Sequence, residues 1–193
     1  MADSLGDGRG ERTRAVILEA SRKLFLERGY AGTPINAITE ACGISRAGFY
    51  TYFEDKRKVF NLLGETVYHD VLAVIAKWET FSASYGLAEV SGWVTDYFEF
   101  LDRHGAFLMA AGHSAPDDEN FKRARDHMMT RSSWKLGQAI DRHGRHSPET
   151  VGVTVTGLLE RAWYGVQTQS VRVDRDEVIA VVAEMIFAMT RRQ

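Results

Sequence analysis

The chain has 193 residues, of which 45% are hydrophobic, 26% are charged and three are proline, and its formal net charge at pH 7 is −2. This hydrophobic content suffices for a packed core and excludes a disordered chain, while the few prolines and the lack of alternating Val, Ile and Thr favour an all-helical protein. No apolar run approaches the ~20 residues that span a bilayer, so we expect no membrane partner.

The N-terminus is acidic and rich in glycine and lacks the hydrophobic stretch of a signal peptide. We expect residues 1–10 to form a flexible tail. A first helix is predicted from about Glu11 to Arg28, because apolar residues recur there at helical spacing. Gly29 is expected to end it.

Two short helices joined by a tight turn are predicted next. Thr33 is suited to cap the first helix, and Pro34 suits its first position, where a missing N–H costs nothing. Gly43 is placed to end this helix in a left-handed conformation. Ser45 is placed to cap the second helix.

The second short helix is predicted to expose a face that fits the major groove of DNA. Its Phe49 and Phe53 lie four residues apart and face inward, which leaves small, basic and hydroxyl-bearing side chains on the opposite face. Small residues allow a close approach, while Arg and Tyr reach base edges and phosphates. The exposed face consists of Arg46, Ala47, Gly48, Tyr50, Thr51 and Tyr52.

The segment GISRAGFYTYFEDK, from Gly43 to Lys56, resembles the DNA-binding signature of the TetR-type (TetR/AcrR) transcriptional regulators. That signature has a glycine, an aliphatic residue and a serine, a short variable stretch, then an aromatic residue, Tyr, any residue, Tyr or His, and Phe, with a lysine three residues later. Gly48 departs from it, because the family more often has threonine or another small residue there. An ordinary helical hairpin with coincidental aromatic residues is the alternative interpretation.

The resemblance implies an all-α fold of about nine helices. Residues 11–54 would form a three-helix head that contains the helix-turn-helix, and residues 55–193 a ligand-binding and dimerisation domain. The implied function is a repressor that leaves a palindromic operator when a small effector binds. Double-stranded operator DNA, the effector and a second copy of the chain are the expected partners, in the cytoplasm and without a cofactor.

Within the short helices, Arg46 is expected to read a base, with guanine favoured through O6 and N7. Tyrosine, threonine and lysine side chains are expected mainly to hold phosphates and fix the register. The predicted DNA-binding residues are Thr33, Asn36, Ser45, Arg46, Ala47, Gly48, Tyr50, Thr51, Tyr52 and Lys56.

The distribution of charge supports a DNA partner better than the net charge does. Residues 9–60 hold ten Lys and Arg against six Asp and Glu, whereas residues 61–193 hold fourteen against eighteen. The positive balance therefore lies in the segment that carries the motif. Its modest size suits a protein that doubles its phosphate contacts by binding as a dimer.

Beyond the head, a long helix capped by Asp55 is predicted to run to about Thr80, joining the head to the rest of the chain without a flexible linker. Helices are then expected over residues 87–103 and 106–113, with a break at His104-Gly105. Three more are expected over residues 118–143, 147–170 and 174–192, where Ser147 with Pro148 and Asp174 mark the last two starts.

The central helices carry more large aromatic and flexible side chains than a small core needs. Singly, each is best interpreted as core packing, but together they suggest a cavity for an apolar or aromatic ligand. The predicted ligand-binding residues are Trp93, Tyr97, Phe98, Phe107, Met128, Trp134, Trp163 and Tyr164.

The last helix is apolar on more than one side, so it must be covered on more than one side. One side is expected to pack within its own domain and another against a second copy, as the resemblance also implies for the last two helices. The predicted dimer-interface residues are Val155, Leu159, Val166, Val178, Val182, Met185 and Met189.

Other functions of this sequence are weaker interpretations. A metal-responsive protein could use the histidines and carboxylates His104, His113, Asp117, Asp118 and His127, but their spacing is not that of a metal-binding helix. Catalysis is disfavoured, because no nucleophile elbow, phosphate-binding loop or CxxC motif is present. An activator of the same fold stays open, since repression depends on where the operator lies. The single cysteine, Cys42, fits a reducing compartment and is expected to be a small buried residue.

Overall fold

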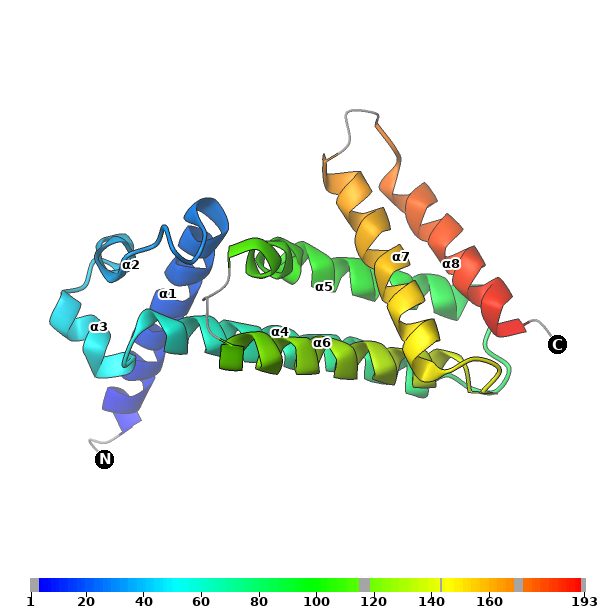
Figure 1. Ribbon diagram of the computed structural model, residues 1–193, viewed down its shortest axis with the longest axis horizontal. Coiled ribbons are helices and arrows are strands. Elements are labelled where there is room, and N and C mark those ends of the chain that lie inside the picture. Colours follow the sequence, from blue (N-terminus) through cyan, green and yellow to red (C-terminus); the bar gives the residue numbers. More distant parts are fainter. Residues whose placement is uncertain (1–3, 115–118, 143, 169–171, 192–193) are drawn as a thin grey trace. The chain divides into compact units, whose positions relative to one another are not determined.

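The structure is a computed structural model that describes residues 4–114, 119–142, 144–168 and 172–191. These residues form eight α-helices, and no strand occurs within these ranges (Figure 1). The expected all-α fold is confirmed. The helices are α1 (Ser4–Arg28), α2 (Ile35–Cys42), α3 (Arg46–Tyr52), α4 (Lys56–Glu79), α5 (Leu87–Ser114), α6 (Glu119–Ile140), α7 (Pro148–Thr168) and α8 (Arg175–Arg191).

Contacts divide the chain into two compact units. Unit 1 contains residues 1–66 and 106–122, and unit 2 contains residues 67–105 and 123–193. The start of α4 therefore packs with the N-terminal helices rather than with unit 2. The expected boundary after residue 54, between a DNA-binding domain and a ligand-binding and dimerisation domain, is a functional division and stays a proposal.

The first helix is longer than predicted. α1 begins at Ser4 instead of Glu11, so residues 4–10 of the expected tail are helical. Its apolar face is confirmed, because Ile17, Leu24 and Phe25 are all buried. The ring of Phe25 contacts that of Phe60 in α4 at a centroid distance of 5.2 Å, and this contact begins the core of unit 1.

The turn between α2 and α3 confirms the predicted role of Gly43. Gly43 has a φ of 65°, in the left-handed region where glycine meets no steric penalty. Its N–H and that of Ile44 donate to the last carbonyls of α2, those of Glu40 and Thr39, at 3.2 and 3.0 Å. The chain can thus reverse between the two helices within three residues.

The start of α4 also follows the sequence. The Lys58 N–H donates to Oδ1 of Asp55 at 2.7 Å, which confirms Asp55 as the cap. By length and composition alone, α4 is also long and apolar enough to cross a membrane. The core helix of a soluble protein meets the same two criteria, and Val59 and Trp78 of α4 are fully buried.

The predicted break at His104-Gly105 is wrong, because α5 is continuous from Leu87 to Ser114. Gly105 is buried against the indole ring of Trp163 in α7, and a Cβ at this position would lie 2.6 Å from Cζ3 of that ring. The glycine therefore permits close packing of α5 on α7 instead of ending a helix. The merged helix explains why eight helices are found in the described ranges rather than about nine.

The last two helices begin as predicted and run side by side (Figure 1). Pro148 is the first residue of α7, and Ser147 accepts a hydrogen bond from the Thr150 N–H at 3.3 Å. Asp174 accepts one from the Glu177 N–H at 2.9 Å at the start of α8. Both caps are confirmed.

Candidate nucleic-acid interface

Helix α3, the candidate recognition helix, is fixed to unit 1 by its buried face. Phe49 is fully buried and Phe53, directly after the helix, is 3% exposed, as the spacing of the two rings predicts. Ser45 caps α3, because its hydroxyl accepts a hydrogen bond from the Gly48 N–H at 3.0 Å. The opposite face of α3 is left to solvent.

That opposite face has the composition expected of a groove-binding surface. Arg46, Ala47, Tyr50 and Thr51 are exposed, and Tyr52 is half-buried. Gly48 is also half-buried, and because it has no side chain, nothing projects from α3 at this position. Backbone and short side chains can therefore come close to a base edge here.

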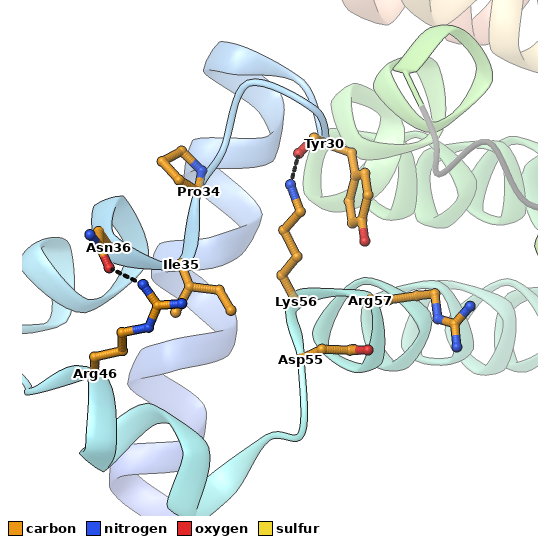
Figure 2. Close-up of a pocket in the computed structure, with 8 residues that line it drawn as sticks. All are labelled: Tyr30, Pro34, Ile35, Asn36, Arg46, Asp55, Lys56 and Arg57. Carbon is orange, nitrogen blue, oxygen red and sulfur yellow. Dashed lines mark hydrogen bonds between the residues drawn. The ribbon is translucent and has the colours of Figure 1, made fainter.

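The guanidinium of Arg46 is held between α2 and α3. It donates to Oδ1 of Asn36 at 3.1 Å (Figure 2). It also donates to the hydroxyl of Tyr50 at 3.2 Å. It also lies over the Tyr50 ring, 5.7 Å from the ring centroid. Asn36 thus orients Arg46 from the preceding helix, which ties the predicted base-reading side chain to both helices of the motif.

An open cleft of about 480 Å³ lies beside this group. Figure 2 shows its lining, which comes from the α1–α2 turn, the start of α2, the start of α3 and the start of α4. Three of the lining side chains are cationic, and the Asp55 carboxylate already caps α4. A phosphate fits this chemistry. The lining residues are Tyr30, Pro34, Ile35, Asn36, Arg46, Asp55, Lys56 and Arg57.

Lys56 has a role that the sequence analysis did not predict. Its ammonium donates to the main-chain carbonyls of Tyr30 at 2.7 Å and Thr33 at 3.0 Å, and it lies 4.3 Å from the centroid of the Tyr30 ring. Burial lowers its pKa. Two of its three N–H donors therefore join α4 to the α1–α2 turn. A phosphate contact through the third N–H donor of Lys56 stays a prediction.

The two roles predicted for Thr33 are wrong. Thr33 is fully buried, and its hydroxyl is directed at the carbonyls of Leu24 and Gly29, at 3.1 and 2.8 Å. The side chain cannot reach a phosphate from this position. The cap of α2 is instead Pro34, with no side-chain hydrogen bond. A threonine before a proline resembles an N-cap in sequence, but here the Thr33 hydroxyl donates to carbonyls at the end of α1 instead.

The start of α1 lies beside α3, which the sequence did not reveal. A Cβ on Gly10 would lie 3.9 Å from Cε1 of Tyr52, and the Arg14 guanidinium lies 5.5 Å from the centroid of the Phe53 ring. Arg9 and Arg12 are exposed on the same stretch of α1. The helix thereby brings further positive charge next to the recognition helix.

Most of the predicted ligand-binding residues are packed core. Trp93 donates from Nε1 to the Val74 carbonyl at 2.9 Å, and Trp163 donates from Nε1 to Asp102 at 2.8 Å. Phe98 is fully buried, and Phe107 packs on Phe60 in unit 1. The side chains of Met128, Trp134 and Tyr164 are half-buried, and Tyr97 is 2% exposed.

The predicted dimer-interface residues divide into two groups. Val155, Leu159 and Val182 are buried within the chain itself, so their assignment to a surface shared with a second copy is corrected. Met185 is 53% exposed, and Val166, Val178 and Met189 are half-buried. Two exposed valines, Val153 and Val181, extend the apolar surface of α7 and α8. Periodicity could not tell the two apolar faces of these helices apart.

The remaining candidates give no metal or redox centre within the described residues. No group of three or more potential metal ligands occurs there. His104 pairs with Asp70, Nε2 to Oδ2 at 2.7 Å, while Asp117, Asp118 and the side chain of His113 lie outside the described part. Cys42 is half-buried rather than a core residue, and burial raises the pKa of its thiol.

The fold and this surface define a class: an all-helical protein with an exposed, cation-bearing helix-turn-helix. Residues 17–63 match the family of bacterial regulatory proteins described as the tetR family. The resemblance seen in the sequence is thus confirmed over residues 17–63, which match the N-terminal region of that family.

Individual relatives are similar over short stretches of the chain. The transcriptional repressor AcnR of Corynebacterium efficiens is 42% identical over 48 residues, which cover 25% of this chain and 26% of AcnR. The regulator TtgR of Pseudomonas putida is 35% identical over 65 residues, which cover 33% of this chain and 31% of TtgR. The matches therefore span about a quarter to a third of the length of these relatives.

The fold is shared over nearly the whole chain. A transcriptional regulator from Aquifex aeolicus has a TM-score of 0.71 at 16% identity, and the match covers 92% of this chain and 99% of that one. The TetR-family regulator PfmR of Thermus thermophilus has a TM-score of 0.69 at 17% identity, with 89% and 93% covered. At these identities the likeness concerns the fold alone.

Proposed function

We propose that this protein is a cytoplasmic transcriptional regulator that binds a palindromic operator as a homodimer. The observation that carries the proposal is the exposed face of α3, with Arg46 held by Asn36 and Tyr50. α3 enters the major groove and Arg46 reads a base, after exchanging its contacts with Asn36 and Tyr50 for a guanine edge. The cleft beside it takes a backbone phosphate.

Regulation by a small molecule is the second part of the proposal. A small apolar or aromatic effector binds the helical C-terminal part and favours a conformation in which the two heads no longer match the operator. The effector shifts this equilibrium only by its difference in affinity for the two conformations. The resulting activity is that of a repressor released by its effector.

The test is binding of the purified protein to DNA from upstream of its own gene, followed by fluorescence anisotropy at several salt concentrations. Arg46→Ala is expected to weaken binding by about 1–3 kcal/mol and to relax the preference for one base pair. Arg131→Ala, which removes an exposed arginine from α6, is the matched control and should bind like the original protein. Unchanged affinity and preference in Arg46→Ala would show that Arg46 does not read a base.

A reporter gene under the same upstream DNA distinguishes repression from activation. Deletion of the regulator should raise expression of the reporter. A fall would assign the activator role to the same DNA-binding surface.

A further inference from the structure

The start of α4 is joined to the α1–α2 turn by a polar and an apolar contact, both within unit 1. The Lys56 ammonium donates to the main-chain carbonyls of Tyr30 at 2.7 Å and Thr33 at 3.0 Å. Figure 2 shows this side chain reaching from the start of α4 to Tyr30. One turn further along α4, the Phe60 ring contacts those of Phe25 and Tyr30, each at a centroid distance of 5.2 Å. The two contacts share Tyr30, so both hold the same turn.

The α1–α2 turn is stiff where it leads into α2. The Thr33 N–H donates to the Tyr30 carbonyl at 3.3 Å, which closes the turn. The Thr33 hydroxyl is directed at carbonyls at the end of α1. Pro34 follows directly as the N-cap of α2, and its ring restricts φ, which is −74° here. A displacement of the turn therefore moves the start of α2 with it.

The two helices on either side of this joint lead to different parts of the chain. α4 is one continuous helix from Lys56 to Glu79, and the division between the two units falls within it, after Thr66. On the other side, α2 connects to α3 through the tight turn at Gly43. The orientation of α3 relative to the start of α4 thus depends on the joint that Lys56 and Phe60 make.

Lys56 differs from the two cations that follow it in α4. Its side chain is half-buried, whereas Arg57 and Lys58 are exposed. Main-chain carbonyls take two of its three N–H donors, and the ammonium lies 4.3 Å from the centroid of the Tyr30 ring, which adds a cation–π attraction. A cation whose only role was to meet DNA would gain nothing from these inward contacts. They indicate that Lys56 positions the helices around it.

We propose that Lys56 is a positioning residue for operator binding: its ammonium clamps α4 to the turn before α2 and thereby sets the orientation in which α3 meets DNA. In the homodimer, two copies of α3 must reach two half-sites at a fixed spacing. The clamp presets each head for that spacing, so the second half-site is bound at a higher effective concentration. This inference rests on the proposed function, since it assigns a residue to operator binding by the dimer.

The test measures how binding depends on the distance between the half-sites. Fluorescence anisotropy compares the natural operator with one that has two extra base pairs between its half-sites. The original protein should bind the lengthened operator more weakly. For Lys56→Met, which keeps an unbranched side chain without the ammonium, the ratio of the two affinities should be smaller by about tenfold, the size of one charge-assisted hydrogen bond.

Lys58→Met is the matched control, because it removes an exposed cation from the same turn of α4. It should keep the original ratio of affinities. A ratio that also stays at its original value in Lys56→Met overturns the proposal. A slope of binding against salt concentration that is then lower by about one per subunit would assign Lys56 to a phosphate contact alone.

Amide hydrogen exchange tests the clamp without DNA and also reports folding of the variant. In Lys56→Met the N–H groups of Thr33 and Ala37, in the turn and at the start of α2, should exchange about tenfold faster or more. The N–H of Ser21, which is buried within α1, should exchange as in the original protein. Unchanged exchange at the turn, or equal acceleration at Ser21, overturns the proposal. If exchange changes as expected but the protein binds no DNA, the proposed function fails and the clamp is supported.

Discussion

Thr33 and Lys56 join three segments of unit 1 through main-chain carbonyls. The Thr33 hydroxyl is directed at the last turn of α1, while the Lys56 ammonium binds the carbonyls of Tyr30 and Thr33 itself. The carbonyls at the end of a helix have no partner within it. These two side chains therefore add hydrogen bonds to carbonyls at the end of α1 and in the turn after it, and they set the position of α2 relative to α4 within unit 1.

Thr33→Val is expected to lower the free energy of unfolding by about 1–3 kcal/mol, because it replaces the buried hydroxyl with a methyl group and removes the hydrogen bond that this hydroxyl donates at the end of α1. Thr51→Val is the matched control, since the Thr51 hydroxyl bonds to the Ala47 carbonyl at an exposed position. Urea unfolding followed by circular dichroism measures both. Equal effects of the two substitutions would mean that the buried hydroxyl contributes little.

At the scale of the helix, glycines decide how closely α5, α6 and α7 pack. Gly105 lies under the Trp163 ring, whereas Gly137 and Gly152 bring two backbones together. The same Trp163 ring donates from Nε1 to Asp102, which also binds Arg175 at the start of α8. Burial alone would raise the pKa of Asp102, but the hydrogen bonds from Arg175 and Trp163 outweigh it and lower the pKa overall. Asp102 of α5, Trp163 of α7 and Arg175 of α8 thus link three helices around one indole ring.

Gly105→Ala is expected to cost about 1–3 kcal/mol of stability, because the added methyl group would overlap a rigid ring in a packed core. Gly92→Ala in the same helix is the matched control. A Cβ there would meet no atom within 4 Å, so this substitution should stabilise the helix by about 0.5–1 kcal/mol. Thermal unfolding of the two variants should therefore shift in opposite directions. A Gly105→Ala protein that unfolds at the original temperature would show that Trp163 can move aside.

At the scale of the whole molecule, α7 and α8 present apolar side chains that the chain itself does not cover. Val153 of α7 is 65% exposed, and Val181 and Met185 of α8 are 49% and 53% exposed. Residues 181 and 185 lie one turn apart on one face of α8. Exposed apolar side chains on two neighbouring helices are typical of a protein–protein contact. They support the proposed homodimer with a residue set different from the one that periodicity suggested.

Met185→Glu is expected to shift the protein toward monomers, because it places a charge in the proposed interface. It should also weaken operator binding, since a single head makes half of the phosphate contacts. Ala180→Glu introduces the same charge on the face of α8 that carries Glu177 and Glu184, and it should leave the dimer intact. Sedimentation equilibrium decides the matter: an original protein that is monomeric at micromolar concentration would exclude this interface.

The sequence by itself determined the all-α fold, the starts of α4, α7 and α8, and the helix-turn-helix with Gly43, Ser45, Phe49 and Phe53 in their observed roles. These features depend on capping and spacing over three or four residues, so they can be recognised locally. The tertiary structure alone decided that the side chains of Thr33 and Lys56 bond to main-chain carbonyls of unit 1, and that α5 continues through Gly105 without a break. It also decided which apolar side chains of α7 and α8 stay exposed. Each of these depends on a contact between residues far apart in the chain, and hydrophobic periodicity shows that a face is apolar but not what covers it.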